Sequence, residues 1–256
     1  MKKTKIIAVV NQKGGVGKTT SAINLSSFLS EEGYKTLVID MDPQANATSG
    51  LGLRKEKIKE SLYEFLLDAS KTEKVIYPTP FDNLHVIPST KDLVGAEVEM
   101  VQIVSRETIL KERLQLVSDY YDYIIIDCPP SLGLLTVNAL VAADKTLIPV
   151  QCEYFALEGL SSLLDTIRLI KDSFNPNLEV AGILLTMFDQ RTTLNKQVVE
   201  NAKEFFQELV FETIIPRNIR LSEAPSHGLP VALYYPKSKG SLAYMNLAKE
   251  VITRVN

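Results

Sequence analysis

The chain has 256 residues, of which 45% are hydrophobic and 23% charged, the balance of an ordinary folded protein. This composition excludes a disordered chain or a fibrous repeat, and the length fits a single α/β domain over residues 1–256. The net charge of −3 excludes a uniformly basic nucleic-acid binder but allows a local basic patch. The two cysteines are too few for a disulfide framework or a zinc quartet. Without a visible signal peptide or membrane span, we expect a soluble, cytoplasmic protein.

Short apolar, β-branched runs alternate with helical patterns along the chain. The runs are mostly apolar throughout and do not alternate, as is typical of strands buried on both faces of a parallel sheet. Such alternation predicts right-handed crossovers and an α/β fold with a doubly wound, mostly parallel sheet flanked by helices. We expect strands at residues 6–10, 36–40, 84–87, 123–127, 146–150, 180–186 and 212–215. We expect helices at residues 17–32, 58–69, 105–118, 132–142, 157–173, 193–209 and 240–254.

Ligands of a doubly wound sheet bind beyond the carboxyl ends of its strands. Functional residues are therefore expected directly after Val10, Ile39, Ile126, Val150 and Ile215. Residues 54–104 are less regular, and their basic run RKEKIKE mixes charges of both signs. Mixed signs favour a solvated helix face over a binding patch.

A glycine-rich loop, KGGVGKTT at residues 13–20, joins the first expected strand to the first helix. Its glycines let backbone N–H groups surround an anion, and the helix directs its positive end toward the same place. Lys18 can reach the β- and γ-phosphates, and the Thr19 hydroxyl can bind Mg²⁺. Gln12 replaces the first Walker A glycine and Lys13 is an added lysine, so the loop is a deviant form. The expected phosphate-binding residues are Lys13, Gly14, Gly15, Val16, Gly17, Lys18, Thr19 and Thr20.

Carboxylates follow two more of the expected strands. Asp40 and Asp42 end the second strand, and residues i and i+2 point the same way if a strand continues. Beside a phosphate loop, both would face the metal and the attacking water. Asp127 ends the run YIII in Walker B form and would approach Mg²⁺ directly or through its waters. The cofactors predicted by these segments are ATP or ADP and Mg²⁺.

Together these segments resemble the ParA/Soj family of the deviant Walker A (MinD/ParA) superfamily, P-loop ATPases that partition chromosomes and plasmids. The likeness covers nearly the whole chain, with one small departure at Ala45, where many relatives have glycine. The matching blocks are NQKGGVGKTT (11–20), DPQANATSGLG (42–52), DCPPSLG (127–133), PVQCE (149–153) and IPRNIRLSEAPSHG (215–228).

The resemblance implies a role for particular residues. Two ATP-bound subunits of this family face each other, and the deviant lysine, here Lys13, crosses to the partner's phosphates. Asp42 matches the aspartate needed for hydrolysis, and Glu153 matches a residue near the ribose across the dimer. Asp40 and Asp127 match the metal-side acids. The segment that contacts adenine in this family corresponds here to Pro216, Arg217 and Asn218. ATP is favoured over GTP because no Asn-Lys-x-Asp signature for guanine is present.

Sequence-independent DNA binding is also implied by the resemblance. Arg191, in the segment FDQRT, and Arg220 match the family's DNA contacts. Phosphate contacts of this kind depend on charge and salt and not on base edges. The implied partners are nonspecific double-stranded DNA, a second copy in a homodimer with ATP, and a ParB-like centromere-binding protein that stimulates a slow ATPase. This implies a nucleoid-associated protein. Further patch lysines would be Lys196, Lys203, Lys237 and Lys239.

Two other classes share the phosphate loop. A MinD-like membrane-associated positioning ATPase carries a C-terminal amphipathic helix, whereas the last residues here, LAKEVITRVN, lack a basic, aromatic-rich tail. We therefore expect no stable membrane binding. An iron–sulfur reductase of the nitrogenase iron-protein type needs two cluster cysteines, which Cys128 and Cys152 match poorly.

Overall fold

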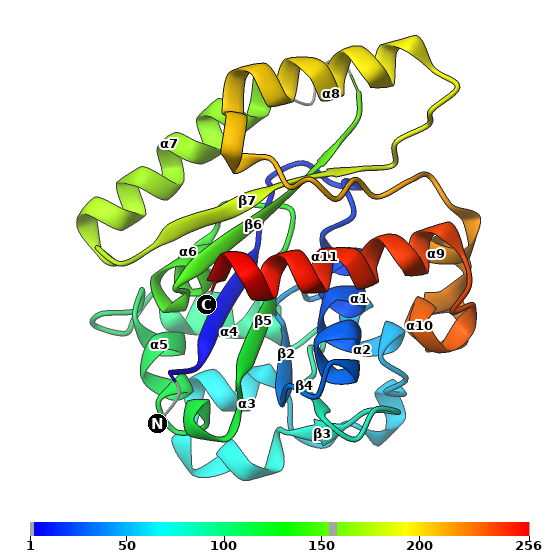
Figure 1. The fold of residues 1–256 in the computed structure, drawn as a ribbon. Helices are drawn as coiled ribbons and strands as arrows, with labels where there is room; N and C mark the ends of the chain where they lie inside the picture. Colours follow the sequence, from blue (N-terminus) through cyan, green and yellow to red (C-terminus); the bar gives the residue numbers. More distant parts are fainter. Residues whose placement is uncertain (1–2, 154–157, 256) are drawn as a thin grey trace.

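The computed structural model describes residues 3–153 and 158–255. Its centre is one seven-stranded sheet with helices on both faces (Figure 1). The strand order is β3-β4-β2-β5-β1-β6-β7, and every neighbouring pair is parallel except β3 with β4. This confirms the predicted doubly wound, mostly parallel sheet. The strands are β1 (Lys5–Val9), β2 (Thr36–Asp40), β3 (Tyr77–Pro78), β4 (Leu84–Ile87), β5 (Tyr123–Asp127), β6 (Lys145–Gln151) and β7 (Glu179–Thr186).

Helices account for most of the remaining described chain. The α-helices are α1 (Lys18–Glu31), α2 (Asn46–Gly50), α3 (Leu62–Leu67), α4 (Leu93–Met100), α5 (Ile109–Leu114), α6 (Leu134–Ala142), α7 (Glu158–Ser173), α8 (Thr193–Phe206), α9 (Ile219–Glu223), α10 (Val231–Tyr234) and α11 (Lys239–Val255). Short 3₁₀ turns include η1 (Lys55–Lys57), η2 (Ala69–Lys74) and η6 (Ala224–His227). The basic run at 54–60 is exposed as expected, but it contains a short 3₁₀ turn and is not the face of an α-helix.

The strands separate two hydrophobic cores, which explains why their sequences are apolar throughout. Ile7 and Val9 of β1 pack with α1 and α11 on one face, and Ala8 packs into the core on the other face. Alternate strand residues point to opposite faces, so a strand covered on both sides needs apolar side chains at every position. A buried contact of 3.0 Å between the Ser21 and Tyr244 hydroxyls joins α1 to α11.

One expected strand is wrong. Residues 212–215 run beside β7 but form no ladder, since only isolated bridges join Val210 to Ile183 and Pro216 to Phe188. The backbone N–H groups of residues 212 and 213 donate to the Glu250 carboxylate on α11, at 2.8 and 2.9 Å. A side chain from a distant helix therefore takes the donors that a strand would have used.

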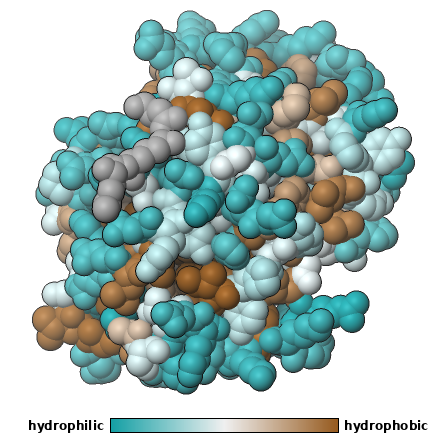
Figure 2. Space-filling view, turned by 60° about the horizontal axis from the view of Figure 1, so that its bottom comes forward, coloured by the Kyte–Doolittle hydropathy of each residue, from teal (hydrophilic) through white to brown (hydrophobic). Residues whose placement is uncertain are grey.

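Several elements were shorter than expected or not foreseen. The helices expected at 58–69 and 105–118 are reduced to α3 and α5, and α2, α4, α9, α10 and β3 were not predicted. Residue 157, where the helix at 157–173 was expected to begin, lies outside the described residues. Figure 2 shows hydrophilic side chains over most of one face, with hydrophobic ones in separate patches. No helix in the described part of the chain is long and apolar enough to cross a membrane.

Gly182 in β7 is expected to tolerate no side chain. A Cβ there would lie 2.6 Å from the Phe211 ring and 3.0 Å from the Leu209 carbonyl oxygen. Gly182→Ala should therefore lower the free energy of unfolding by about 1–3 kcal/mol, because a packed core resists added volume. Urea unfolding measures this change. Gly95→Ala in α4 is the matched control, since its Cβ meets only ordinary contacts; equal losses in both variants would contradict the steric explanation.

Candidate nucleotide-binding site

The phosphate loop lies between β1 and α1 and is held open by fixed backbone geometry. Gly15 and Gly17 have φ values of 74° and 92°, in the left-handed region that favours glycine. The Asn11 side chain braces the loop, since its amide donates to the Pro149 carbonyl at 2.8 Å and its oxygen accepts from the Lys13 N–H at 2.9 Å. From β7, the Thr186 hydroxyl donates to the Val16 carbonyl at 2.9 Å. The loop is therefore preformed to surround an anion.

The two lysines of the loop have different environments. Lys18 is buried, and its ammonium donates to the Lys13 carbonyl oxygen at 3.0 Å. Burial lowers the pKa of Lys18, and nearby Asp127 acts in the opposite direction. The Lys13 side chain is 46% exposed, with its ammonium 3.8 Å from the Glu153 carboxylate. The two residues that the resemblance assigned to a dimer contact thus lie side by side.

The two aspartates after β2 do not share one role. Asp40 is fully buried, and its oxygens accept from the Asp42 N–H at 3.2 Å and from the Thr48 N–H and hydroxyl at 2.7 Å each. Burial raises the pKa of Asp40 to about 6, against the lowering effect of these hydrogen bonds. Asp42 lies just inside the surface, and one of its oxygens accepts from the Gln44 N–H at 2.9 Å. Asp40 thus holds the turn that presents Asp42.

Ala45 occupies a conformation that suits glycine. Its φ of 58° and ψ of 39° lie in the left-handed region, and the residue is buried where α2 begins. A non-glycine residue there is strained by about 1 kcal/mol. This accounts for the glycine of many relatives and shows that the turn keeps its shape without it.

Asp127 is the best candidate for a metal-side acid. Its carboxylate is fully buried, and neither oxygen has a hydrogen-bond partner of good geometry in the described residues. Burial, together with the charge of Asp40, holds the pKa of Asp127 well above its usual value, while Thr19 is near enough to lower it. An unpaired buried carboxylate is costly unless a cation or water meets it, so Asp127 and Thr19 fit Mg²⁺. The described residues hold no ready cluster of three His, Cys, Asp or Glu side chains, so most ligands would be phosphate and water.

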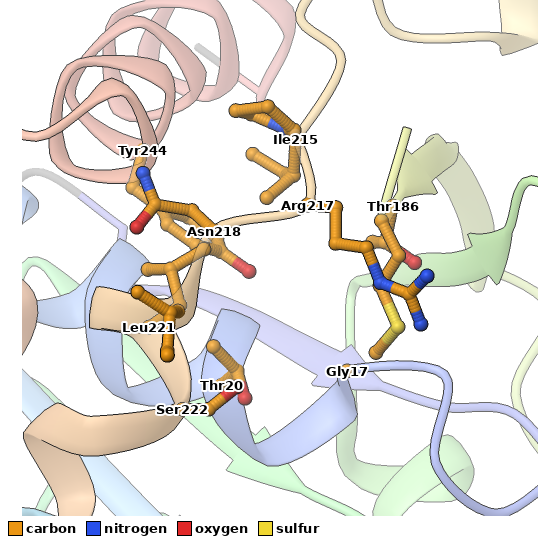
Figure 3. A pocket seen from close by; sticks show the side chains of 12 residues that line it. Gly17, Thr20, Thr186, Ile215, Arg217, Asn218, Leu221, Ser222 and Tyr244 are labelled. Atoms are coloured by element: carbon orange, nitrogen blue, oxygen red, sulfur yellow. The ribbon is translucent and has the colours of Figure 1, made fainter. Parts of the chain in front are cut away.

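A pocket of about 420 Å³ opens beside the loop (Figure 3). Gly17 and Thr20 form its floor, and its walls include all three residues expected at adenine, Pro216, Arg217 and Asn218. In Figure 3, Arg217 lies on the side of Thr186, and Asn218 on the side of Tyr244. The lining also includes Met187, Ile215, Ile219, Leu221 and Ser222. Its mixed apolar and polar lining and its position suit a flat base attached to phosphates in the loop.

The segment after α2 crosses the segment after η6 at two glycines. Gly52 has a φ of +88° and Gly228 a φ of +64°. A Cβ on Gly52 would lie 3.0 Å from the Gly228 carbonyl oxygen, and one on Gly228 would lie 3.2 Å from the Gly52 Cα. This crossing joins the chain that follows Asp42 to the chain that follows Arg220.

Both expected DNA-binding arginines pair with carboxylates of the same chain. Arg191 pairs with Asp189 at 2.6 Å, and Arg220 pairs with Glu223 at 2.7 Å. Arg220 also lies over the Tyr235 ring, 4.9 Å from its centre. Among the additional lysines, Lys203 is paired with Glu212 at 2.9 Å. The remaining three, Lys196, Lys237 and Lys239, are exposed.

Three residues of the site were not predicted as functional: Asn11, Thr48 and Thr186. Asn11 stood within a matching block but received no role, and Thr48 is revealed only by the fold, because it binds Asp40 from α2. Thr186 ends β7, so the rule that sites gather at strand ends could have found it. Both cysteines are buried in the core, which leaves neither at the surface for a cluster between subunits.

The chain is similar to known proteins over most of its length. A family model described as an AAA domain matches residues 4–180. The sporulation initiation inhibitor protein Soj of Bacillus subtilis is 56% identical over 96% of this chain and 98% of its own. The chromosome partitioning protein ParA of Myxococcus xanthus is 54% identical over 98% of this chain and 88% of its own.

Solved structures show the same fold. McdA of Cyanothece in complex with ATP has a TM-score of 0.87 at 26% identity and covers 99% of this chain and 98% of its own. Cobyrinic acid a,c-diamide synthase of Mycobacterium smegmatis, with an ATP analogue and magnesium, has a TM-score of 0.84 at 36% identity and covers 96% and 93%. The MinD cell division ATPase of Pyrococcus furiosus has a TM-score of 0.80 at 28% identity and covers 97% and 98%.

The sheet and the loop that follows β1 define a P-loop ATPase of the MinD/ParA type. Within that type, the identities above 50% to Soj and ParA exceed those to the MinD structure. The chain belongs to the Soj/ParA family of chromosome-partitioning ATPases.

Proposed function

We propose that this protein is an ATP-driven DNA-partitioning switch built as one ATPase domain over residues 1–256. Two ATP-bound copies form a sandwich dimer that binds duplex DNA without sequence preference, which places the protein on the nucleoid. Hydrolysis is slow in the protein alone, is stimulated by a ParB-like partner, and releases the DNA. The Soj and ParA relatives and the ATP and magnesium complexes of the structural neighbours support this proposal.

The chemical roles follow from the positions of the side chains. Thr19 and Asp127 would hold Mg²⁺, which would neutralise charge on the phosphate oxygens when bound. Lys18 binds the β- and γ-phosphates after leaving the Lys13 carbonyl that it contacts here. Asp40 positions the turn beside this metal site, and Asp42 orients the attacking water.

Lys13 and Glu153 act across the dimer. Both side chains are about half exposed at the mouth of the loop, so they can reach a facing copy. Lys13 meets the partner's phosphates and supplies positive charge where it develops in the transition state, as an arginine finger does. Glu153 lies near the partner's ribose.

One contact between the pocket and α9 carries the switch proposal. Asn218 lines the nucleotide pocket, and its side chain also caps α9 by accepting from the Arg220 N–H at 2.9 Å. A base in this pocket therefore meets the residue that begins the helix bearing Arg220. Because a cap fixes the first turn of a helix, nucleotide can act directly on the DNA-binding side chain.

Fluorescence anisotropy of a random-sequence duplex tests the switch. We expect binding with a slowly hydrolysed ATP analogue and little with ADP, and a tenfold or greater loss between low and high salt, since phosphate contacts release counterions. Equal binding in both nucleotide states would contradict the switch, and no binding in either would contradict DNA binding.

Arg220→Glu should keep nucleotide affinity and reduce duplex affinity by about tenfold or more, because a cation becomes an anion in both halves of the dimer. Lys74→Glu, which reverses the charge of an exposed lysine in η2, is the matched control. An unchanged duplex affinity in Arg220→Glu, or an equal loss in Lys74→Glu, would remove Arg220 from the DNA site.

A further inference from the structure

A groove of about 230 Å³ lies next to the nucleotide pocket, where the chain leaves β7. Three cations line it: Arg191, Arg217 and Lys239, the last at the start of α11. Asp189 is the one acid among its described lining residues. Arg217 also lines the nucleotide pocket, so the pocket and the groove share a wall. A concave surface with several converging cations is suited to an oxyanion.

The Asp189 carboxylate already occupies the Arg191 guanidinium. The Nε and Nη2 atoms of Arg191 donate to its two oxygens at 2.9 and 2.6 Å, and the Arg191 backbone N–H donates at 3.0 Å. These hydrogen bonds, with a smaller effect of Arg217, hold the pKa of Asp189 well below its usual value, so the carboxylate stays ionised. Two parallel bonds from one guanidinium are also how arginine binds a phosphate.

Asp189 is held in place while Arg191 remains accessible. The Asp189 N–H donates to the Asn195 side-chain oxygen at 2.7 Å, and the Asn195 amide donates to the Cys152 carbonyl at 2.7 Å. The Asp189 side chain is only 19% exposed, whereas that of Arg191 is 84% exposed. An incoming phosphate can therefore reach the guanidinium, but it must compete with a fixed carboxylate.

We propose that Asp189 is an internal substitute for a DNA phosphate, which occupies Arg191 and partly neutralises the groove until DNA displaces it. The inference rests on the DNA binding proposed above and assigns Asp189 the role of lowering that affinity. Displacement exchanges one ion pair for another, so the gain on binding DNA is smaller than that of a free arginine. A weaker contact lets the switch leave DNA once its dimer dissociates.

Arg220, the second arginine expected at DNA, is also paired with a nearby carboxylate of the same chain. The Arg220 guanidinium donates to the Glu223 carboxylate at 2.7 Å, and the Tyr234 hydroxyl contacts that carboxylate at 3.4 Å. The basic side chains Arg54, Lys55 and Lys57 near η1 differ, since none of them forms an ion pair within the described residues. Both arginines that are expected at DNA are thus paired with a local acid, as Arg106 is with Glu107 and Arg254 with Glu250.

Duplex affinity of full-length Asp189→Asn with a slowly hydrolysed ATP analogue tests the inference. We expect affinity to rise by about 3- to 10-fold over the wild type, because exposed ion pairs are individually weak and a dimer carries two grooves. The slope of log affinity against log salt should steepen by about 1 to 2, since each groove gains one net positive charge. A merely structural role for Asp189 would not steepen this slope.

Three further variants make the result specific. Asp189→Glu retains the carboxylate and should bind like the wild type. Glu179→Gln removes the same negative charge at the start of β7, where Glu179 forms an ion pair with Lys145 of β6. This variant should change duplex affinity little. In an Arg191→Ala background, Asp189→Asn should give less than half of its gain if it acts through Arg191.

Thermal melting checks the fold, and Asp189→Ser is a second uncharged variant if the asparagine variant melts early. If the wild type binds DNA normally and neither variant binds more tightly, the inference is wrong while DNA binding stands. An equal gain in duplex affinity in Glu179→Gln would mean that net charge alone explains the gain in Asp189→Asn. That result would also overturn the inference. A wild type that binds no duplex in either nucleotide state would overturn both proposals.

Discussion

Asp42→Ala should slow ATP hydrolysis by at least about 100-fold and leave ATP binding intact, because a group that orients or activates water contributes about that much. The Asp42 carboxylate accepts from the Gln44 N–H of its own turn, whereas Asn11 and Thr186 brace the phosphate loop, so the loop keeps these contacts without Asp42. The charge of Asp42 has a minor effect on Lys18, whose pKa it raises. With hydrolysis blocked, the ATP-bound dimer should accumulate on DNA. Phosphate release and duplex anisotropy with ATP, measured side by side, check both results.

Asn46→Ala is the control for disturbance of the turn after β2. Asn46 lies in the first turn of α2, which follows Asp42. The variant alters a neighbouring polar side chain without removing a carboxylate, and its hydrolysis rate should stay within a few-fold of the wild type. Normal turnover in Asp42→Ala would refute the role of Asp42. A fall in ATP affinity as large as the fall in rate would make Asp42 a binding residue.

Lys13→Ala should also lose most hydrolysis, and mixing it with Asp42→Ala should restore part of the activity. If Lys13 acts on the partner's nucleotide, a mixed dimer has one complete site, with Asp42 from one copy and Lys13 from the other. An equal mixture should then reach about a quarter of the wild-type rate, since half of the dimers are mixed and each has one of two sites complete.

Each variant alone should remain inactive, and this sets the baseline for the mixture. If Lys13 served its own nucleotide, neither site of a mixed dimer would be complete, and mixing would restore nothing. The exposure of the Lys13 side chain beside Glu153 favours restoration. A mixture no faster than its components would overturn action across the dimer.

The parallel strands could be predicted because each is buried on both faces and is therefore mostly apolar along its length. Residues 212–215 end in two isoleucines, yet they form no strand, because Glu250 on α11 binds the backbone N–H groups of residues 212 and 213. A competitor 37 residues or more along the chain leaves no local signal. Helix α4 was missed because its exposed face carries Val94 and Val98, which hides any amphipathic pattern.

Residues of the site could be predicted where a motif fixes both type and spacing, as in the phosphate loop. The segment expected at adenine lies beside that loop, since Pro216, Arg217 and Asn218 line the same pocket as Gly17, and its contact with adenine stays a prediction. The resemblance gave Asp40 and Asp42 different roles, but the sequence could not show that the Thr48 hydroxyl on α2 donates to Asp40. Nor could it show that Asp189 occupies Arg191, since only side-chain geometry reveals that pair.

The crossing of Gly52 and Gly228 constrains which substitutions two distant segments of the chain can accept. Backbone meets backbone there, so a larger residue on one side cannot be accommodated by a smaller one on the other. The usual route of compensating substitutions is closed at this point. The segments that carry Asp42 and Arg220 can therefore change at other positions. At the crossing itself, both Gly52 and Gly228 must remain glycine.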